Sequence, residues 1–146
     1  MSLFRSREEF HRTFDALFDL LSTDPGVGPA LRATRTRQRY VFPDFGTTLD
    51  VRESDDKRAA TGQNLYWTWD GKRVTWRPDV VLELTSETAN RYFQGKENVP
   101  LALARKRIVV TDGDVAKILD LLPIVLPFHT KWVAHLKTAG PEHLLV

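Results

Sequence analysis

The side chains that could do acid–base, nucleophilic or metal chemistry are scattered along this sequence without the spacing of a catalytic motif. No two histidines have the i, i+4 spacing that places two metal ligands on one helical face; the four are His11, His129, His135 and His143. Cysteine is absent, which removes thiolate metal sites and cysteine nucleophiles. The sequence also lacks a Gly-x-Ser-x-Gly elbow, a glycine-rich phosphate loop and a Rossmann fingerprint. We therefore expect no metal and no cofactor.

Several carboxylates fall on or near expected strand ends, where a carboxyl group inside an apolar cavity would have a raised pKa and serve as a general acid or base. An isomerase or cyclase acting on a hydrophobic substrate, with Asp50, Asp70 or Glu83 as its acid or base, is therefore the alternative function. Asp44, Asp70 and Asp79 each lie beside Pro or Gly, as aspartates in turns often do, so their presence does not require a catalytic site. Asp50 and Glu83 fit solvated strand faces, so we favour a protein that is not an enzyme.

Basic residues gather in an arginine row, Arg32, Arg35, Arg37 and Arg39, and in a second run at 105–107. The chain has 21 Lys plus Arg against 19 Asp plus Glu, and this net charge of +2 is too small to favour a nucleic-acid partner. The row also lacks interleaved aromatic residues that would stack on bases. Such a row would attract an anionic membrane surface, where each basic residue contributes about 1 kcal/mol. We expect transient contact with such a surface and no nucleic acid.

The elements that must position these side chains follow from hydrophobic periodicity. A helix is predicted at 7–22, because Ser6 and Glu9 form a capping box and Pro25 ends the apolar stripe. Strands are expected at 35–42, 47–52, 65–69, 80–84 and 108–110. Further helices are expected at 87–94, at 100–105 and after Asp114. Residues 74–76 should form either a short return strand or the end of a hairpin. We expect 27–32 to be a connection and 54–64 a loop. This order is segregated α+β, and it predicts one domain, 1–146, in which helices cover one face of an antiparallel or mixed sheet of about five strands.

The apolar residues are concentrated in two places. Trp67 and Trp69 lie on one expected strand, and residues 118–128 are apolar on nearly all sides. Pro123 and Pro127 interrupt this second segment, so it should bend across the sheet, where it would either roof a hydrophobic cavity or simply pack as core. A third hypothesis is an interaction domain in which the segment docks a partner enzyme.

The location follows from two absences. Residues 1–10 lack the continuous apolar region of a secretory signal. No stretch approaches the run of about 18 to 20 apolar residues that spans a bilayer. We expect a soluble cytoplasmic protein.

One long stretch resembles a known family. Residues 80–114, VVLELTSETANRYFQGKENVPLALARKRIVVTDGD, resemble the central signature of the sterol-carrier-protein domain, in which a strand, a capped helix, a Gly-ended turn and a second helix lead to a strand that closes on Gly-Asp. The matching positions are Leu82, Leu84, Ser86, Gly95, Ala102, Ala104, Ile108, Val110, Gly113 and Asp114. Residues 24–45 also resemble the passage from helix to first strand in small bacterial members. The basic run at 105–107 and the prolines of the last helix depart from the family pattern.

The resemblance implies a five-stranded sheet covered on one side by helices, with a hydrophobic tunnel between them that holds sterols, fatty acids or fatty acyl chains. Such domains carry apolar lipids and are not enzymes. From strand and helix alternation, the residues expected to line the tunnel are Trp67, Trp69, Leu82, Leu84, Phe93, Leu103, Ile118, Leu122, Leu126 and Phe128. The chain ends in Leu-Leu-Val, so the peroxisomal targeting of eukaryotic members does not carry over.

Overall fold

The computed structural model describes residues 3–146, and its first helix, α1 (Arg7–Thr23), has the predicted start. Ser6 caps this helix, since its hydroxyl accepts a hydrogen bond from the Glu9 backbone N–H at 3.0 Å. The apolar stripe of α1 is buried against the sheet, and it consists of Phe10, Phe14, Leu17, Phe18 and Leu21. α1 is therefore the main hydrophobic cover of the core.

The sheet has five strands, as the sequence predicts. They are β1 (Gln38–Phe42), β2 (Thr47–Glu53), β3 (Leu65–Trp69), β4 (Val80–Leu84) and β5 (Ile108–Gly113). Their order across the sheet is β3-β2-β1-β4-β5. β1 and β4 are parallel, and the other three pairs are antiparallel. This mixed sheet confirms the predicted α+β fold class.

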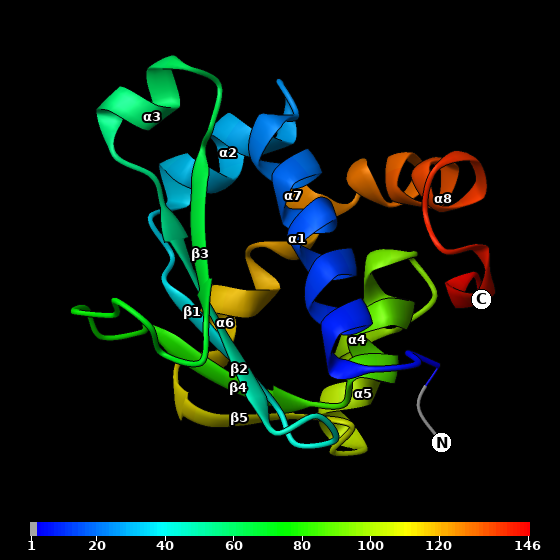
Figure 1. Ribbon diagram of the computed structural model, residues 1–146. Coiled ribbons are helices and arrows are strands. Elements are labelled where there is room, and N and C mark those ends of the chain that lie inside the picture. The colour runs from blue at the N-terminus through cyan, green and yellow to red at the C-terminus, as the bar shows by residue number, and fades with distance from the viewer. Residues whose placement is uncertain (1–2) are drawn as a thin grey trace.

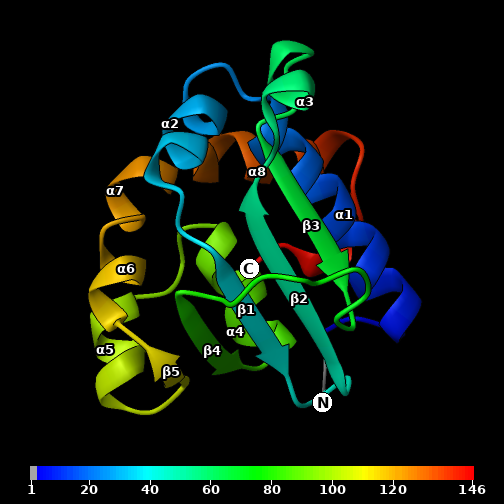
Figure 2. The same cartoon turned by 90° about the vertical axis from the view of Figure 1, so that its left-hand side faces the viewer.

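The remaining helices are short, and several lie between strands in the chain. They are α2 (Val27–Thr34), α3 (Asp56–Ala60), α4 (Ser86–Phe93), α5 (Val99–Ala104), α6 (Val115–Leu119), α7 (Leu122–Val125), α8 (Phe128–Thr138) and a final 3₁₀ turn at Glu142–Leu144. Figures 1 and 2 show α1, α4 and α8 behind one face of the sheet, while the segment between β3 and β4 crosses the opposite, outer face. No helix within residues 3–146 is long and apolar enough to cross a membrane.

The structure corrects two expected connections. All of the connection expected at 27–32 belongs to α2, which packs closely on the end of α1. Glycine permits this approach at position 28, because a Cβ there would lie only 2.5 Å from the Ser22 carbonyl oxygen. The strand expected from residue 35 begins at Gln38, since Arg35 ends α2 in the left-handed conformation with φ 52°. The expected loop at 54–64 contains α3, whose N-cap is Asp55.

Two further expectations are corrected near the strand and helix ends. Residues 74–76 form no strand, because Asp70, Gly71 and Arg73 all have positive φ and turn the chain out of the sheet. The expected C-terminal helix is three helices, α6, α7 and α8, broken around Pro123 and Pro127. These breaks bend the segment around the end of the helical layer.

Candidate functional site

An apolar cavity of about 70 Å³ lies between the sheet and the helices. Each strand and most helices contribute to its wall, which is formed by Phe18, Leu21, Leu31, Thr36, Gln38, Tyr40, Val51, Glu53, Leu65, Leu82, Leu84, Tyr92, Phe93, Val99, Ile108, Ile118, Leu121, Leu122 and Val125. A smaller hollow of about 20 Å³ continues it toward Phe14 and Leu49. Sites for drug-sized ligands occupy roughly 300–1,000 Å³. The cavity must therefore widen several-fold before it can hold a lipid.

The part of the wall best able to move is the segment of α6 and α7. Ile118, Leu121 and Val125 are buried on the cavity side of this segment. Its two helices have only five and four residues, so few backbone hydrogen bonds hold them. Short, proline-bounded turns of this kind open at lower free energy than long helices. This segment is therefore the candidate cover of the cavity.

One edge of the cavity reaches an open, mainly apolar groove of about 560 Å³ beside α7, which Lys96, Glu97 and Asn98 also line and which is called the apolar groove below. Tyr92, Val99 and Leu122 line both the cavity and the groove, so these three side chains separate the interior from the surface. Leu126 lines the groove and is 65% exposed. This edge offers an apolar route into the cavity.

The opposite wall of the cavity is polar, where the start of β1 lies beside the end of β2. The Tyr40 hydroxyl donates a hydrogen bond to Gln38 Oε1, and Gln38 Nε2 donates to the Thr36 carbonyl oxygen at 3.3 Å. Burial raises the pKa of both Tyr40 and Tyr92, so both phenols stay neutral. The polar side chains of this wall are therefore neutral and already hydrogen-bonded, with the exception of one charged residue.

The exception is Glu53, which lines the cavity from the last position of β2. Its Oε1 accepts hydrogen bonds from Arg37 at 3.1 Å and Arg52 at 2.9 Å. Burial by itself raises the pKa of Glu53, but hydrogen bonds from Arg37 and from its own backbone N–H, together with the two guanidinium charges, outweigh burial and lower the pKa. Glu53 is therefore a carboxylate at neutral pH.

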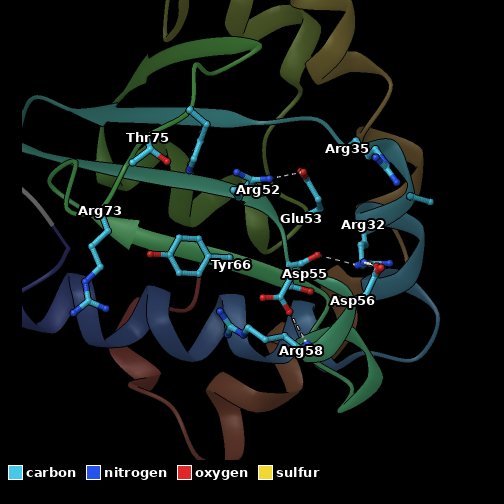
Figure 3. Close-up of a pocket in the computed structure, with 13 residues that line it drawn as sticks. Arg32, Arg35, Arg52, Glu53, Asp55, Asp56, Arg58, Tyr66, Arg73 and Thr75 are labelled. Carbon is cyan, nitrogen blue, oxygen red and sulfur yellow. Dashed lines mark hydrogen bonds and ion pairs between the residues drawn. The ribbon is translucent and has the colours of Figure 1, made fainter.

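Glu53 also lines a second, open groove of about 770 Å³ on the surface (Figure 3). Five arginines surround this arginine groove, together with Tyr66 and Trp76, and they are Arg32, Arg35, Arg52, Arg58 and Arg73. Arg32 pairs with Asp56 at 2.6 Å, and the Arg52 guanidinium lies 5.7 Å from the Trp76 ring. The groove and the cavity thus meet at a single carboxylate.

Among the ten residues expected to line the tunnel, five line the cavity. These are Leu82, Leu84, Phe93, Ile118 and Leu122. Phe128 is buried in the hydrophobic core, and Leu103 is a partly buried residue that packs against this core. Leu126 lies in the apolar groove. Sequence alternation thus placed the β4 residues beside the cavity, but it could not distinguish cavity wall from ordinary core.

The two tryptophans lie on the helical side of the sheet but away from the cavity. β3 is one of the two edge strands, and its Trp67 and Trp69 pack against α1. The indole N–H of each donates a hydrogen bond to Asp15 Oδ1, at 3.0 Å for Trp67 and 2.8 Å for Trp69. These contacts tie the edge of the sheet to α1.

The three carboxylates considered for acid–base chemistry do not line the cavity. Asp50 is fully buried and pairs with Arg39 at 2.7 Å on the outer face of the sheet. Asp70 pairs with Arg7 at 2.6 Å and accepts a hydrogen bond from the Thr47 hydroxyl. Glu83 is exposed on β4. Within residues 3–146, no group of three or more His, Cys, Asp or Glu side chains could hold a metal ion.

Sequence reasoning missed Glu53, although the pattern of its strand contained it. Leu49 and Val51 alternate inward along β2, and the next inward position is Glu53. The same period-2 pattern could therefore have identified the carboxylate in the cavity wall.

No protein-family model matches the sequence, and no curated protein matches it. Among solved structures, the chain is similar to the inverting sec-alkylsulfatase Pisa1 from Pseudomonas sp., at 20% identity and a TM-score of 0.58, over 75% of this chain. It spans only 16% of the length of that enzyme.

Two other solved structures are similar over most of both chains. One is described as the UbiJ-SCP2 ubiquinone synthesis protein, with 9% identity, a TM-score of 0.59, and coverage of 80% of this chain and 92% of that one. The other is apo sterol carrier protein 2 from Yarrowia lipolytica, with 14% identity, a TM-score of 0.55, and coverage of 88% and 95%. The fold of this chain is thus the sterol-carrier-protein fold, as the sequence resemblance predicted.

Proposed function

We propose that this chain, which has the sterol-carrier-protein fold, binds apolar lipids of the sterol, fatty acid or fatty acyl type between its sheet and helices and transfers them without catalysis. The observation that carries the proposal is the apolar cavity closed by the α6–α7 segment. Affinity would come mainly from buried apolar area, at roughly 25 cal/mol per Å². Specificity for the lipid tail would therefore be loose.

Binding would proceed through the widened form of the cavity. A lipid entering from the apolar groove first meets Tyr92, Val99 and Leu122, and then the α6–α7 segment moves outward. In this tunnel the bound tail would contact the five lining residues that the sequence also selects, among them Leu82 and Leu84 on β4.

The arginine groove would contact an anionic membrane surface during loading or release, in the cytoplasm. Arg35, Arg58 and Arg73 project from three separate segments around one open hollow (Figure 3). Glu53, Asp55 and Asp56 also line the groove, so its five arginines leave a local excess of two positive charges, which a concave surface concentrates. Such contacts are transient because salt screens them over about 10 Å.

The enzyme alternative is weaker, since Asp50, Asp70 and Glu83 lie outside the cavity wall. Glu53 does line the wall, but two arginines hold it as a carboxylate with a lowered pKa, which makes it a poor general acid.

Titration with a fluorescent fatty acid and a fluorescent sterol, followed by displacement with unlabelled lipid, tests the proposal. We expect saturable, competitive binding at micromolar concentration, and native mass spectrometry should show a stoichiometric complex. Absence of binding by every apolar ligand would contradict the carrier function.

A further inference from the structure

A fully buried carboxylate oxygen without a partner lies in the cavity wall. Among the residues that the structure describes, two buried side-chain oxygens have no hydrogen-bond partner, Asp50 Oδ2 and Glu53 Oε2. Asp50 is on the outer face of the sheet, so only Glu53 belongs to the cavity. A buried acceptor left unpaired costs free energy, most of all when it is charged. Glu53 Oε2 is therefore unsatisfied in the closed form of the protein.

The neighbouring groups leave this oxygen available for a ligand. Arg37 and Arg52 both donate to Oε1, the other oxygen of the same carboxylate. The backbone N–H of Glu53 is a further donor to this carboxylate, but none of these donors lies within hydrogen-bond distance of Oε2. Gln38 and Tyr40, the polar residues that β1 contributes to the wall, are already hydrogen-bonded to each other or to the backbone. Oε2 also has essentially no accessible surface, so the water of the arginine groove does not satisfy it. A widened cavity would expose it to whatever occupies that space.

We propose that the cavity prefers lipids with a terminal hydroxyl group, which donates a hydrogen bond to Glu53 Oε2 while the tail runs toward the α6–α7 segment. This inference rests on the proposed lipid-binding function and adds the chemistry of the lipid's polar end. The apolar wall beside Leu121 and Val125 suits the tail, and the polar wall of Thr36, Gln38 and Tyr40 surrounds the head.

A fatty acid is the weaker ligand for this end of the cavity. Its ionised carboxylate would bring a second negative charge against Glu53 in a site of low dielectric constant, and like charges repel there more strongly than in water. An alkyl ether accepts hydrogen bonds but cannot donate one, so it would leave Oε2 unpaired. The hydroxyl group alone supplies the missing donor without adding charge.

Three ligands with similar alkyl chains distinguish the hydroxyl, ether and carboxylate head groups in experiments on the unmodified protein. Dodecan-1-ol, its isomer 1-methoxyundecane and dodecanoic acid would each displace a bound fluorescent lipid at pH 7.5. We expect the alcohol to bind roughly tenfold more tightly than its isomeric ether, the ratio that one hydrogen bond to a charged group supplies, and more tightly than the acid. Equal affinity of alcohol and ether, or tighter binding of the acid, would overturn the inference and leave the lipid-binding function intact. Failure of all three ligands and of the probe would overturn both.

Substitution of the carboxylate provides a second arm. In Glu53→Gln the acceptor is neutral, so we expect the ratio between alcohol and ether to shrink several-fold while the affinity for the ether changes little. Glu83→Gln, on the exposed side of β4, is the matched control and should keep the full ratio. An unchanged ratio in Glu53→Gln would count against a role for this oxygen. Should that variant fail to fold, the ligand series on the unmodified protein still decides the question.

Discussion

Lys131 Nζ on α8 lies 2.5 Å from Asp24 Oδ2, across 107 residues of the chain. Asp24 follows α1, and its other oxygen accepts hydrogen bonds from the backbone N–H groups of Gly26 and Val27, each at 2.9 Å. Burial by itself raises the pKa of Asp24, but the hydrogen bonds from Lys131 and from these N–H groups lower it overall. One carboxylate therefore joins the end of α1, the start of α2 and the C-terminal helix.

The backbone bonds of Asp24 should matter more than its ion pair. Asp24→Ala leaves two N–H groups at the start of α2 without their acceptor, and we expect it to lower the free energy of unfolding by about 1–3 kcal/mol. Lys131→Ala removes one pair with a half-exposed lysine, and we expect a loss below about 1 kcal/mol. Urea denaturation measures both, with Lys137→Ala on the same helix as the control. Equal losses in the first two variants would mean that the ion pair dominates.

Filling the cavity entrance should block lipid binding. Leu122→Trp places a larger side chain where the apolar groove meets the cavity, so we expect the affinity for a fluorescent fatty acid to fall at least about tenfold, because access and volume are both lost. Leu119→Trp, three residues earlier, is partly exposed and lines neither the cavity nor the groove, so it is the matched control and should bind as the unmodified protein does. Loss of binding in the control alone would place the entrance elsewhere.

Charge reversal in the arginine groove should weaken membrane contact. The triple variant Arg35→Glu, Arg58→Glu and Arg73→Glu changes three basic residues around one hollow. We expect its partitioning onto vesicles of phosphatidylcholine and phosphatidylserine to fall more than about tenfold at low salt. Sedimentation with the vesicles measures this, and phosphatidylcholine alone should show no difference. A triple variant that binds the anionic vesicles normally would assign the contact to another surface, such as the run at 105–107.

His11 should titrate below its ordinary range. Its ring stacks on Trp69 at a centroid distance of 3.8 Å, and burial lowers its pKa below 6.5, although the charge of Asp70 partly opposes the shift. A histidine with a lowered pKa binds fewer protons folded than unfolded, so its stabilising contribution is present above pH 6.5 and is lost as the pH falls through the folded-state value.

Two measurements check this behaviour of His11. An NMR titration should give a midpoint below 6.5 for the resonance that disappears in His11→Gln, and the variant should lose less stability than the unmodified protein between pH 7.5 and acidic pH. A midpoint at or above 6.5 would show that the charge of Asp70 outweighs burial.

The elements that local sequence signals determine were predicted well. Ser6 and Glu9 located the start of α1, and alternation located β4, because capping and burial act within a few residues. α2 was missed since Gly28 and Pro29 indicate a turn, whereas the close approach of α2 to Ser22 depends on tertiary packing. Periodicity and element order already predicted the layered fold, and the resemblance in residues 80–114 added the expectation of a tunnel between the layers.

The site was harder to predict than the fold. Alternation identified which side of each strand faces the helices, and it did so correctly for Trp67 and Leu82 alike. It could not show which inward side chains border empty space: on β3, Leu65 lines the cavity while Trp67 packs on α1. Position within a sheet is set by long-range pairing, which no local pattern records.

The parallel pairing of β1 with β4 has a consequence for how the chain folds. Tyr40 pairs with Leu82, so the centre of the sheet joins segments separated by both strands of the β2–β3 ribbon. During synthesis one edge of β1 stays open until residues 80–84 emerge, and an open strand edge is a site of intermolecular pairing. Closure of this long loop is also slow relative to hairpin formation. Ribosome-bound chains that stop before β4 should therefore be the aggregation-prone species of this protein.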